Sequence, residues 1–168
     1  MRSRSPLPCA LRDGRTVVVR SIVPADAPAL VELFGRLSPA TSRWRFFKAG
    51  CPSAREAGAQ AGVDHIRCEA FVALDAERVV ALAGFQRFAD ESGAELTLLV
   101  EDAYQGHGLG RQLLMELIAA ATDHGFATLL AEVLPDNERM LRLLETAGLP
   151  TLVDPYFGVL RVAMFLRR

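Results

Sequence analysis

The chain has little cysteine, no long apolar run and almost no net charge, and each shortage excludes a class of protein. Its three cysteines, Cys9, Cys51 and Cys68, are too few and too scattered for a disulfide framework or a four-ligand zinc site. No apolar run approaches the roughly 20 residues that span a bilayer. The formal net charge of -1 gives no general attraction to nucleic acid or anionic lipid. We therefore expect a cytoplasmic protein with no bound metal, no membrane segment and no nucleic-acid partner.

Length and composition predict a single folded domain. With 168 residues, of which 51% are hydrophobic and 23% charged, the chain is long enough for one domain with a core and short for two. Its start, "MRSRSPLPCA", has an apolar stretch that is too short and too interrupted by proline for a secretory signal. We expect a flexible N-terminal tail over residues 1–10 and one domain over residues 11–168.

Hydrophobic periodicity and turn signals predict an α/β (α+β) fold. Strands are expected over residues 15–23, 69–75, 78–88, 94–101, 127–134, 151–154 and 158–166. Helices are expected over residues 24–37, 39–47, 108–124 and 136–148, with one short helix inside the irregular segment 48–66. The strand, helix and strand between residues 94 and 134 form a crossover, which sets two strands parallel. The expected architecture is a mixed, mostly antiparallel central sheet flanked by helices.

Three alternating glycines, Gly106, Gly108 and Gly110, lie between a strand and an apolar helix. The first amide groups of a helix have no partners within it and carry partial positive charge, so glycines placed there let an anion approach closely. The spacing differs from the dinucleotide-binding fingerprint, and the Lys-Ser/Thr end of a P-loop is missing. The pattern therefore favours an anion cradle of another type, with a tight turn that needs glycine only for its backbone angles as the alternative.

The segment from Gln105 to Gly110, after a strand that ends at Val100, resembles the acetyl-CoA pyrophosphate loop of the GNAT superfamily of N-acetyltransferases. The opening "LRDGRTVVVRSIVPADAPALVELFGRLSPATSRWRFF" also resembles the acetyltransferase module of Pat-type bacterial protein lysine acetyltransferases. This resemblance implies a GNAT fold, acetyl-CoA as cosubstrate and a protein lysine as acceptor. Because Pat-type enzymes act on acyl-CoA synthetases, such a synthetase is an expected partner.

The resemblance also implies which residues bind acetyl-CoA. Backbone amides of the glycine segment would hold the pyrophosphate, the preceding strand would pair with the pantetheine arm, and an asparagine at the next helix would bond the pantetheine. The expected cofactor-binding residues are Leu98, Leu99, Val100, Gln105, Gly106, His107, Gly108, Leu109, Gly110, Arg111 and Asn137. Asn137 is equally compatible with a plain helix N-cap.

Acetyl transfer to a lysine needs a group that removes a proton, because an amine with a pKa of about 10.4 is protonated at neutral pH. Glu95 stands where the Pat-type module carries its catalytic glutamate, so we expect it to be the general base. Glu132, inside an apolar strand, is the competing base. Leu144 occupies the position at which many GNAT enzymes place a tyrosine acid, and Tyr156 is a candidate substitute.

Two other functions remain open at this stage. A small-molecule amine N-acetyltransferase would need a concave acidic acceptor pocket, whereas a protein acceptor fits a shallow open groove. A non-catalytic acyl-CoA-binding sensor would bind the cofactor without turnover, and the missing tyrosine agrees with that alternative. The protein is expected to be a monomer or a homodimer formed through its final strands or through the segment 48–66. In "SRWRFFK", residues 42–48, the aromatic side chains are expected to pack on the sheet, with Arg43 and Arg45 beside the acceptor entrance.

Overall fold

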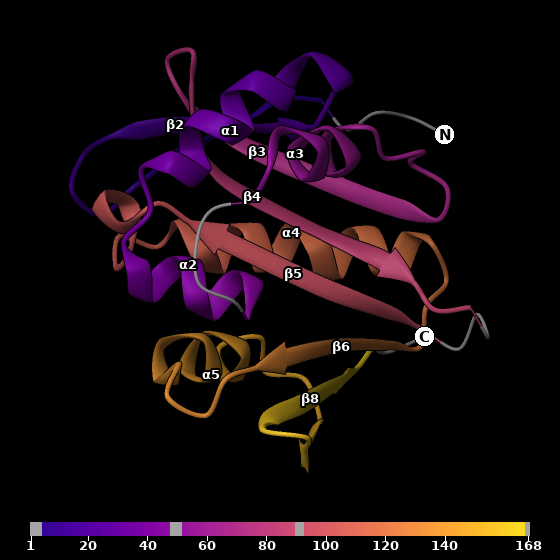
Figure 1. Ribbon diagram of the computed structural model, residues 1–168. Coiled ribbons are helices and arrows are strands. Elements are labelled where there is room, and N and C mark those ends of the chain that lie inside the picture. The colour runs from indigo at the N-terminus through magenta and orange to yellow at the C-terminus, as the bar shows by residue number, and fades with distance from the viewer. Residues whose placement is uncertain (1–4, 48–51, 90–92, 167–168) are drawn as a thin grey trace.

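The computed structural model describes residues 5–47, 52–89 and 93–166, whose eight strands form a single sheet (Figure 1). The strands are β1 (Leu7–Ala10), β2 (Thr16–Ser21), β3 (Cys68–Asp75), β4 (Arg78–Arg87), β5 (Ala94–Val100), β6 (Thr128–Val133), β7 (Thr151–Tyr156) and β8 (Val159–Phe165). Their order across the sheet is β1-β2-β3-β4-β5-β6-β8-β7. Neighbours are antiparallel except β5 and β6, which are parallel, so the expected mixed sheet and its crossover are confirmed.

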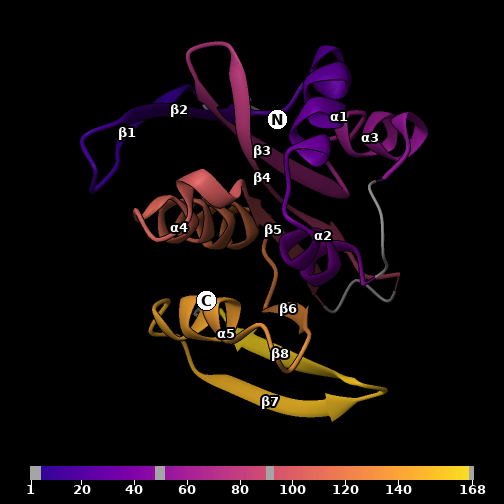
Figure 2. The ribbon, with the colours of Figure 1, turned by 60° about the vertical axis from the view of Figure 1, so that its left-hand side comes forward.

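Helices cover both faces of this sheet. They are α1 (Ala27–Gly35), α2 (Pro39–Phe46), α3 (Ala54–Ala61), α4 (Leu109–Asp123) and α5 (Glu138–Glu145), with single 3-10 turns at η1 (Pro24–Asp26) and η2 (Asp102–Tyr104). The larger core lies between the sheet and α4 and α5, and the smaller core lies between the sheet and α1 and α3. Figure 2 shows α4 and α2 on opposite sides of β5. None of the helices in the described ranges is long and apolar enough to cross a membrane.

Local signals explain where two of the helices begin. Ser38 caps α2, because its hydroxyl oxygen accepts a hydrogen bond from the amide of Thr41 at 3.2 Å, and proline follows at the first helical position. Ser53 caps α3 together with Glu56, which forms a capping box with it. The helix expected over residues 39–47 and the short helix within residues 48–66 are therefore confirmed. Residues 48–51 lie outside the described residues.

The expected flexible tail over residues 1–10 is wrong for residues 7–10. These residues form β1, which pairs with β2 from Leu7↔Val19 to Ala10↔Thr16 and buries the side chain of Cys9. Pro8 within this strand argues against a central strand, but an edge strand tolerates proline because its outer amides need no partner. Residues 1–4 lie outside the described residues.

An ion pair between β2 and the turn before α1 predicts acid sensitivity. Asp26 is buried, its carboxylate accepts both guanidinium nitrogens of Arg20 at 2.7 and 2.8 Å, and it also accepts the amide of Val23 at 2.9 Å. These bonds, chiefly those from Arg20, hold the pKa of Asp26 below its usual value. The stabilisation is therefore present above the unfolded pKa of about 3.9 and is lost as pH falls through the folded pKa.

We expect Asp26→Asn to lower the free energy of unfolding by about 2 to 3 kcal/mol at pH 7, because the variant leaves Arg20 without its counter-charge. The difference from the wild type should shrink below about pH 4, where the carboxyl of Asp26 takes a proton in the unfolded chain, and should disappear as pH falls through the lower folded pKa. Urea unfolding at pH 7 and pH 3.5 measures both values. A difference that is equal at the two pH values would contradict the role given to the ion pair.

Candidate active site

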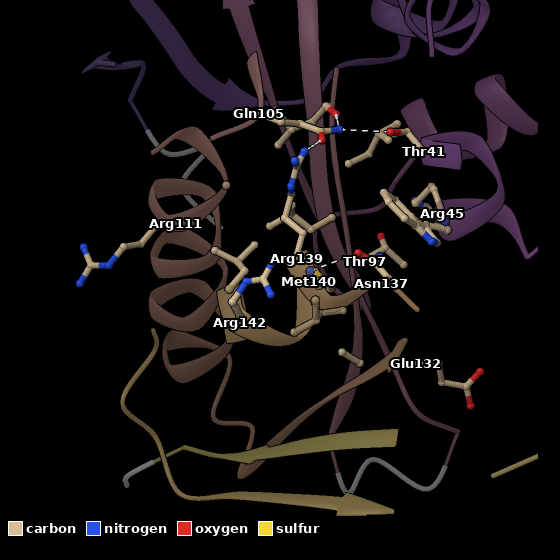
Figure 3. A pocket seen from close by; sticks show the side chains of 18 of the residues that line it. Thr41, Arg45, Thr97, Gln105, Arg111, Glu132, Asn137, Arg139, Met140 and Arg142 are labelled. Atoms are coloured by element: carbon tan, nitrogen blue, oxygen red, sulfur yellow. Dashed lines mark hydrogen bonds between the residues drawn. The ribbon is translucent and has the colours of Figure 1, made fainter. Parts of the chain in front are cut away.

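A cleft of about 850 Å³ opens where β5 and β6 separate. The two strands pair only at Ala94↔Leu129 and Glu95↔Leu130, and β5 continues to Val100 without a partner on this side. The strands come close at one end because Gly93 has no side chain, since a Cβ there would lie 2.5 Å from the carbonyl oxygen of Thr128. The walls of the cleft come from β5, α2, the glycine segment and α5 (Figure 3).

The backbone of β5 offers polar groups to this cleft. Hydrogen bonding in an antiparallel ladder alternates, and the amide of Glu101 donates to the carbonyl of Val80 at 2.9 Å, on the β4 side. The peptide groups of Leu96, Leu98 and Val100 are therefore directed to the opposite side, into the gap. Leu98 and Val100 lie where pairing with an extended ligand was expected. The peptide of Leu99 faces β4 instead, and its side chain is buried in the smaller core.

The glycine segment has a backbone conformation that requires glycine. Gly106 and Gly108 have φ values of +80° and +95°, which L side chains rarely adopt. A Cβ at Gly106 would meet nothing within 4 Å, and one at Gly108 would meet only the side chain of Arg12. Gly108 is also the residue immediately before α4, whose first amide groups have no partners within the helix. The arrangement is an open concave backbone surface at a helix N-terminus, which is suited to an anion.

The side chain of Gln105 connects three elements at the mouth of the cleft (Figure 3). Its amide nitrogen donates to the carbonyl of Val100 at 2.8 Å and to the hydroxyl of Thr41 on α2 at 3.2 Å. Its amide oxygen accepts a hydrogen bond from Arg139 on α5. Sequence reasoning identified Gln105 by its backbone alone and missed Thr41 and Arg139, because contacts between distant segments leave no local pattern.

Glu95 lies at the last position where β5 still pairs with β6. Its neighbours Ala94 and Leu96 are buried in the core beneath α4, so alternation places Glu95 on the opposite face, which carries α2. Burial raises the pKa of the Glu95 carboxyl above its usual value and the carboxylate of Glu132 raises it further, while two nearby arginines lower it. A carboxylate with a raised pKa is the stronger proton acceptor and is suited to general base catalysis.

Arg45 on α2 is one of these two arginines. Burial lowers the pKa of its guanidinium to about 10, and Glu95 opposes that shift. Arg45 is therefore a cation at neutral pH that faces the cleft from the α2 side (Figure 3). This agrees with the expected position of "SRWRFFK" beside the site, and Arg43 reaches across to form an ion pair with Asp136.

Glu132, the competing base, is already engaged by a cation. Arg161 on β8 donates from Nε to the carboxylate of Glu132 at 2.9 Å, and the same guanidinium lies 3.2 Å from the centre of the Tyr156 ring. The carboxylate of Glu132 is therefore paired with an arginine of the neighbouring strand, whereas Glu95 makes no comparable short contact among the described residues. The geometry therefore leaves the carboxylate of Glu95 more accessible than that of Glu132 to a molecule in the cleft.

The structure does not bring a tyrosine acid to the cleft. Leu144 is buried in the larger core and carries no polar group. Tyr156 belongs to β7, and the sheet order places β6 and β8 between β7 and β5. Three strand spacings of about 4.8 Å separate β5 from β7 by roughly 14 Å or more, so Tyr156 is remote from the β5 side of the cleft.

The remaining predicted residues have mixed positions. Asn137 lines the cleft, and its side-chain oxygen accepts the amide of Met140 at 3.1 Å, so the residue is a helix N-cap whose side-chain NH2 group can still donate elsewhere. Arg111 is exposed on α4 and extends away from the other labelled side chains in Figure 3. Leu109 is buried in the larger core, and His107 lies outside the cleft lining. In the described part of the chain, no group of three histidine, cysteine or acidic side chains could hold a metal ion.

Comparisons with known proteins bear on this cleft. The family described as "Acetyltransferase (GNAT) family" matches residues 39–149, which include β5 and β6, the two strands that separate at the cleft, and the glycine segment. An acetyltransferase of Pseudomonas aeruginosa is 31% identical over 153 residues, which cover 87% of this chain and 81% of that protein.

Two solved structures share the fold. The GNAT domain of S. lividans PAT is 29% identical, with a TM-score of 0.89 over 96% of this chain and 97% of that one. YncA of Salmonella typhimurium, solved with its cofactor acetyl-CoA, is 21% identical, with a TM-score of 0.72 over 90% of this chain and 93% of that one.

Proposed function

We propose that this chain, which belongs to the GNAT family of acetyltransferases, transfers the acetyl group of acetyl-CoA to the side-chain amine of a protein lysine. The observation that carries the proposal is the position of Glu95. Glu95 lies at the point where β5 and β6 separate, on the sheet face that carries α2. Burial and the carboxylate of Glu132 raise the pKa of its carboxyl. Glu95 is therefore a proton acceptor on the same strand, β5, whose exposed backbone would hold the thioester arm.

In the proposed reaction, the amine nitrogen attacks the carbonyl carbon of the thioester. Glu95 takes the amine proton, directly or through a water molecule, so that the attacking nitrogen has a free electron pair. A backbone amide of β5 that faces the gap would hold the oxyanion of the tetrahedral intermediate. The carbon–sulfur bond then breaks, and the thiolate of CoA leaves without a tyrosine to protonate it.

The surface beside Glu95 supports a protein acceptor. Strand register places Leu130, Ala163 and Leu152 on the same sheet face as Glu95, across β6, β8 and β7. Leu152 is 59% exposed and Phe165, on the same face, is 43% exposed, so no described helix covers this part of the sheet. A broad open face suits the flat surface around a lysine better than it suits a small amine, which needs enclosure.

A non-catalytic acyl-CoA sensor is the second candidate, because the buried Leu144 leaves the site without the family's tyrosine acid. It predicts binding of acetyl-CoA with no acetylated product. A small-molecule amine acetyltransferase predicts turnover with metabolites alone.

The test follows the label of radioactive acetyl-CoA. The protein is incubated separately with the desalted protein fraction and with the small-molecule fraction of its host, and with a purified acyl-CoA synthetase as the first candidate acceptor. We expect label on protein lysines, located by mass spectrometry and lost with Glu95→Gln. Label only in small amines would replace the protein acceptor, and confirmed binding without any transfer would favour the sensor.

A further inference from the structure

We propose that Arg12 binds a phosphate group of acetyl-CoA, and that the turn between β1 and β2 is a built part of the cofactor site. This inference rests on the acetyl-CoA site described above and deepens it. The turn covers residues 11–15, "LRDGR", and we call it the clasp turn. Nothing in the glycine pattern of the cofactor loop predicts that the opening segment of the chain reaches it.

The clasp turn is held in one conformation by its own bonds. The amide of Leu11 donates to the carbonyl of Arg15 at 2.7 Å, and the amide of Gly14 donates to the carbonyl of Leu11 at 3.1 Å. Gly14 has a φ of +89°, so this sharp reversal needs glycine. The carboxylate of Asp13 accepts both the amide and the side-chain Nε of Arg15, and the side chain of Leu11 is buried in the larger core. The turn is therefore anchored before any ligand arrives.

The clasp turn is also bonded directly to the cofactor loop. The amide of Arg12 donates to the carbonyl of His107 at 3.0 Å, and Asp13 Oδ2 lies 3.5 Å from His107 Nδ1. Arg15 donates to the carbonyl of Ala103 at 2.7 Å and lies 3.9 Å from the centre of the Tyr104 ring. Contacts from Arg12, Asp13 and Arg15 thus fix the backbone on both sides of Gly106. The carbonyl of His107 is therefore one attachment point of the clasp turn on the cofactor loop.

The side chain of Arg12 reaches the cleft itself. It is part of the cleft lining, and its Nε and Cγ lie 3.9 and 4.0 Å from the position that a Cβ on Gly108 would occupy. Gly108 is the residue that precedes α4, so Arg12 lies beside the amides that form the anion cradle. Its guanidinium makes no hydrogen bond or ion pair within the described ranges.

Two other arginines line the cleft without a bond of this kind among the described residues, Arg45 on α2 and Arg111, which is exposed on α4 and extends away from the cleft (Figure 3). The remaining arginines near the cleft are engaged elsewhere. Arg139 donates to Gln105, Arg142 forms an ion pair with Glu138, and Arg43 forms one with Asp136. Arg12 therefore brings a positive charge to the helix N-terminus without first breaking a bond. A guanidinium offers paired donors that match phosphate oxygens, so Arg12 would add charge-assisted bonds to those of the backbone amides.

The experiment compares the binding of two thioesters to Arg12→Ala. We expect the dissociation constant for acetyl-CoA, measured by calorimetry, to rise by about tenfold, because one charge-assisted contact to phosphate is lost. Affinity for S-acetylpantetheine, which has no pyrophosphate, should not change, as followed by ligand-observed NMR. Arg12→Lys should recover part of the affinity, and the salt dependence of acetyl-CoA binding should weaken in Arg12→Ala.

Arg67→Ala is the matched control, because it removes the same charge from an exposed site outside the cleft lining. An unchanged acetyl-CoA affinity in Arg12→Ala would overturn the inference, as would an equal loss of affinity for both thioesters, which indicates a distorted loop. Wild-type protein that fails to bind acetyl-CoA would overturn the cofactor site itself. If the wild type binds acetyl-CoA normally and Arg12→Ala binds it equally well, only the role of Arg12 is overturned.

Discussion

Glu95→Gln is expected to lower kcat for acetyl transfer by about 10²- to 10⁴-fold, the usual contribution of a general base. The dissociation constant for acetyl-CoA should stay close to that of the wild type. Glutamine keeps the shape of the side chain but cannot take the amine proton, while the groups expected to hold the cofactor lie on the β5 backbone and the glycine segment. Steady-state kinetics with the acceptor found by labelling gives kcat, and calorimetry gives the dissociation constant. Unchanged kcat would remove Glu95 from the reaction.

Loss of activity in this variant should not come from unfolding. The pKa of Glu95 is raised in the folded protein, so the protonated side chain is favoured there. Its contribution to stability is therefore present below the unfolded pKa of about 4.3 and is lost as pH rises through the folded pKa. At pH 7 glutamine replaces a disfavoured charge, and we expect the Tm of Glu95→Gln to equal or exceed that of the wild type.

Glu132→Gln is the matched control for the choice of base. Its carboxylate raises the pKa of Glu95, so its removal should lower that pKa and move the acid limb of the pH-rate profile to lower pH. Activity at neutral pH should be largely retained. A loss of kcat in Glu132→Gln as large as that expected for Glu95→Gln would instead make Glu132 the base.

The predictable parts of this fold are those with local signals. The strand and helix patterns, the Ser38 cap and the glycine segment all depend on residues within a few positions of each other. The parallel pair follows from the crossover rule, which applies to nearly every strand-helix-strand unit. Glu95 could be placed on a strand that leads to the cofactor loop, because the strand pattern around it is also local.

The parts that could not be predicted depend on long-range contacts. No local sequence pattern predicts that β5 and β6 separate after only two paired positions, because the pairing of these strands depends on residues more than 30 positions apart. The side chain of Leu99 points into the smaller core because of the register of β5, and this register is fixed only when the whole sheet forms. Likewise, the contact of Arg12 with His107 joins segments almost one hundred residues apart.

Glu101→Gln is expected to lower the free energy of unfolding by about 2 to 3 kcal/mol, because it leaves two arginines without their shared counter-charge. Glu101 is 5% exposed at the end of β5, where it accepts Arg36 Nε at 3.1 Å and also forms an ion pair with Arg78. Arg36 in turn donates to the carbonyl of Val79 at 2.6 Å, so this carboxylate joins α1 to β4. The arginines are partly exposed, which keeps the expected loss below that of a fully buried pair. Urea unfolding at neutral pH measures it.

The consequence for the site depends on where Glu101 lies. Its backbone bonds to Val80 and Tyr104 are at the point where the chain leaves β5 for the glycine segment. We therefore expect Glu101→Gln to weaken acetyl-CoA binding as well, even under conditions in which the protein remains folded. Arg142→Ala is the control, since its pair with Glu138 is exposed on both sides and should contribute less than about 1 kcal/mol. Equal losses of stability in the two variants would mean that burial adds nothing to the Glu101 pairs. A destabilised Glu101→Gln with unchanged affinity would mean that the cofactor loop is held by its other attachments, of which the clasp turn is the nearest candidate.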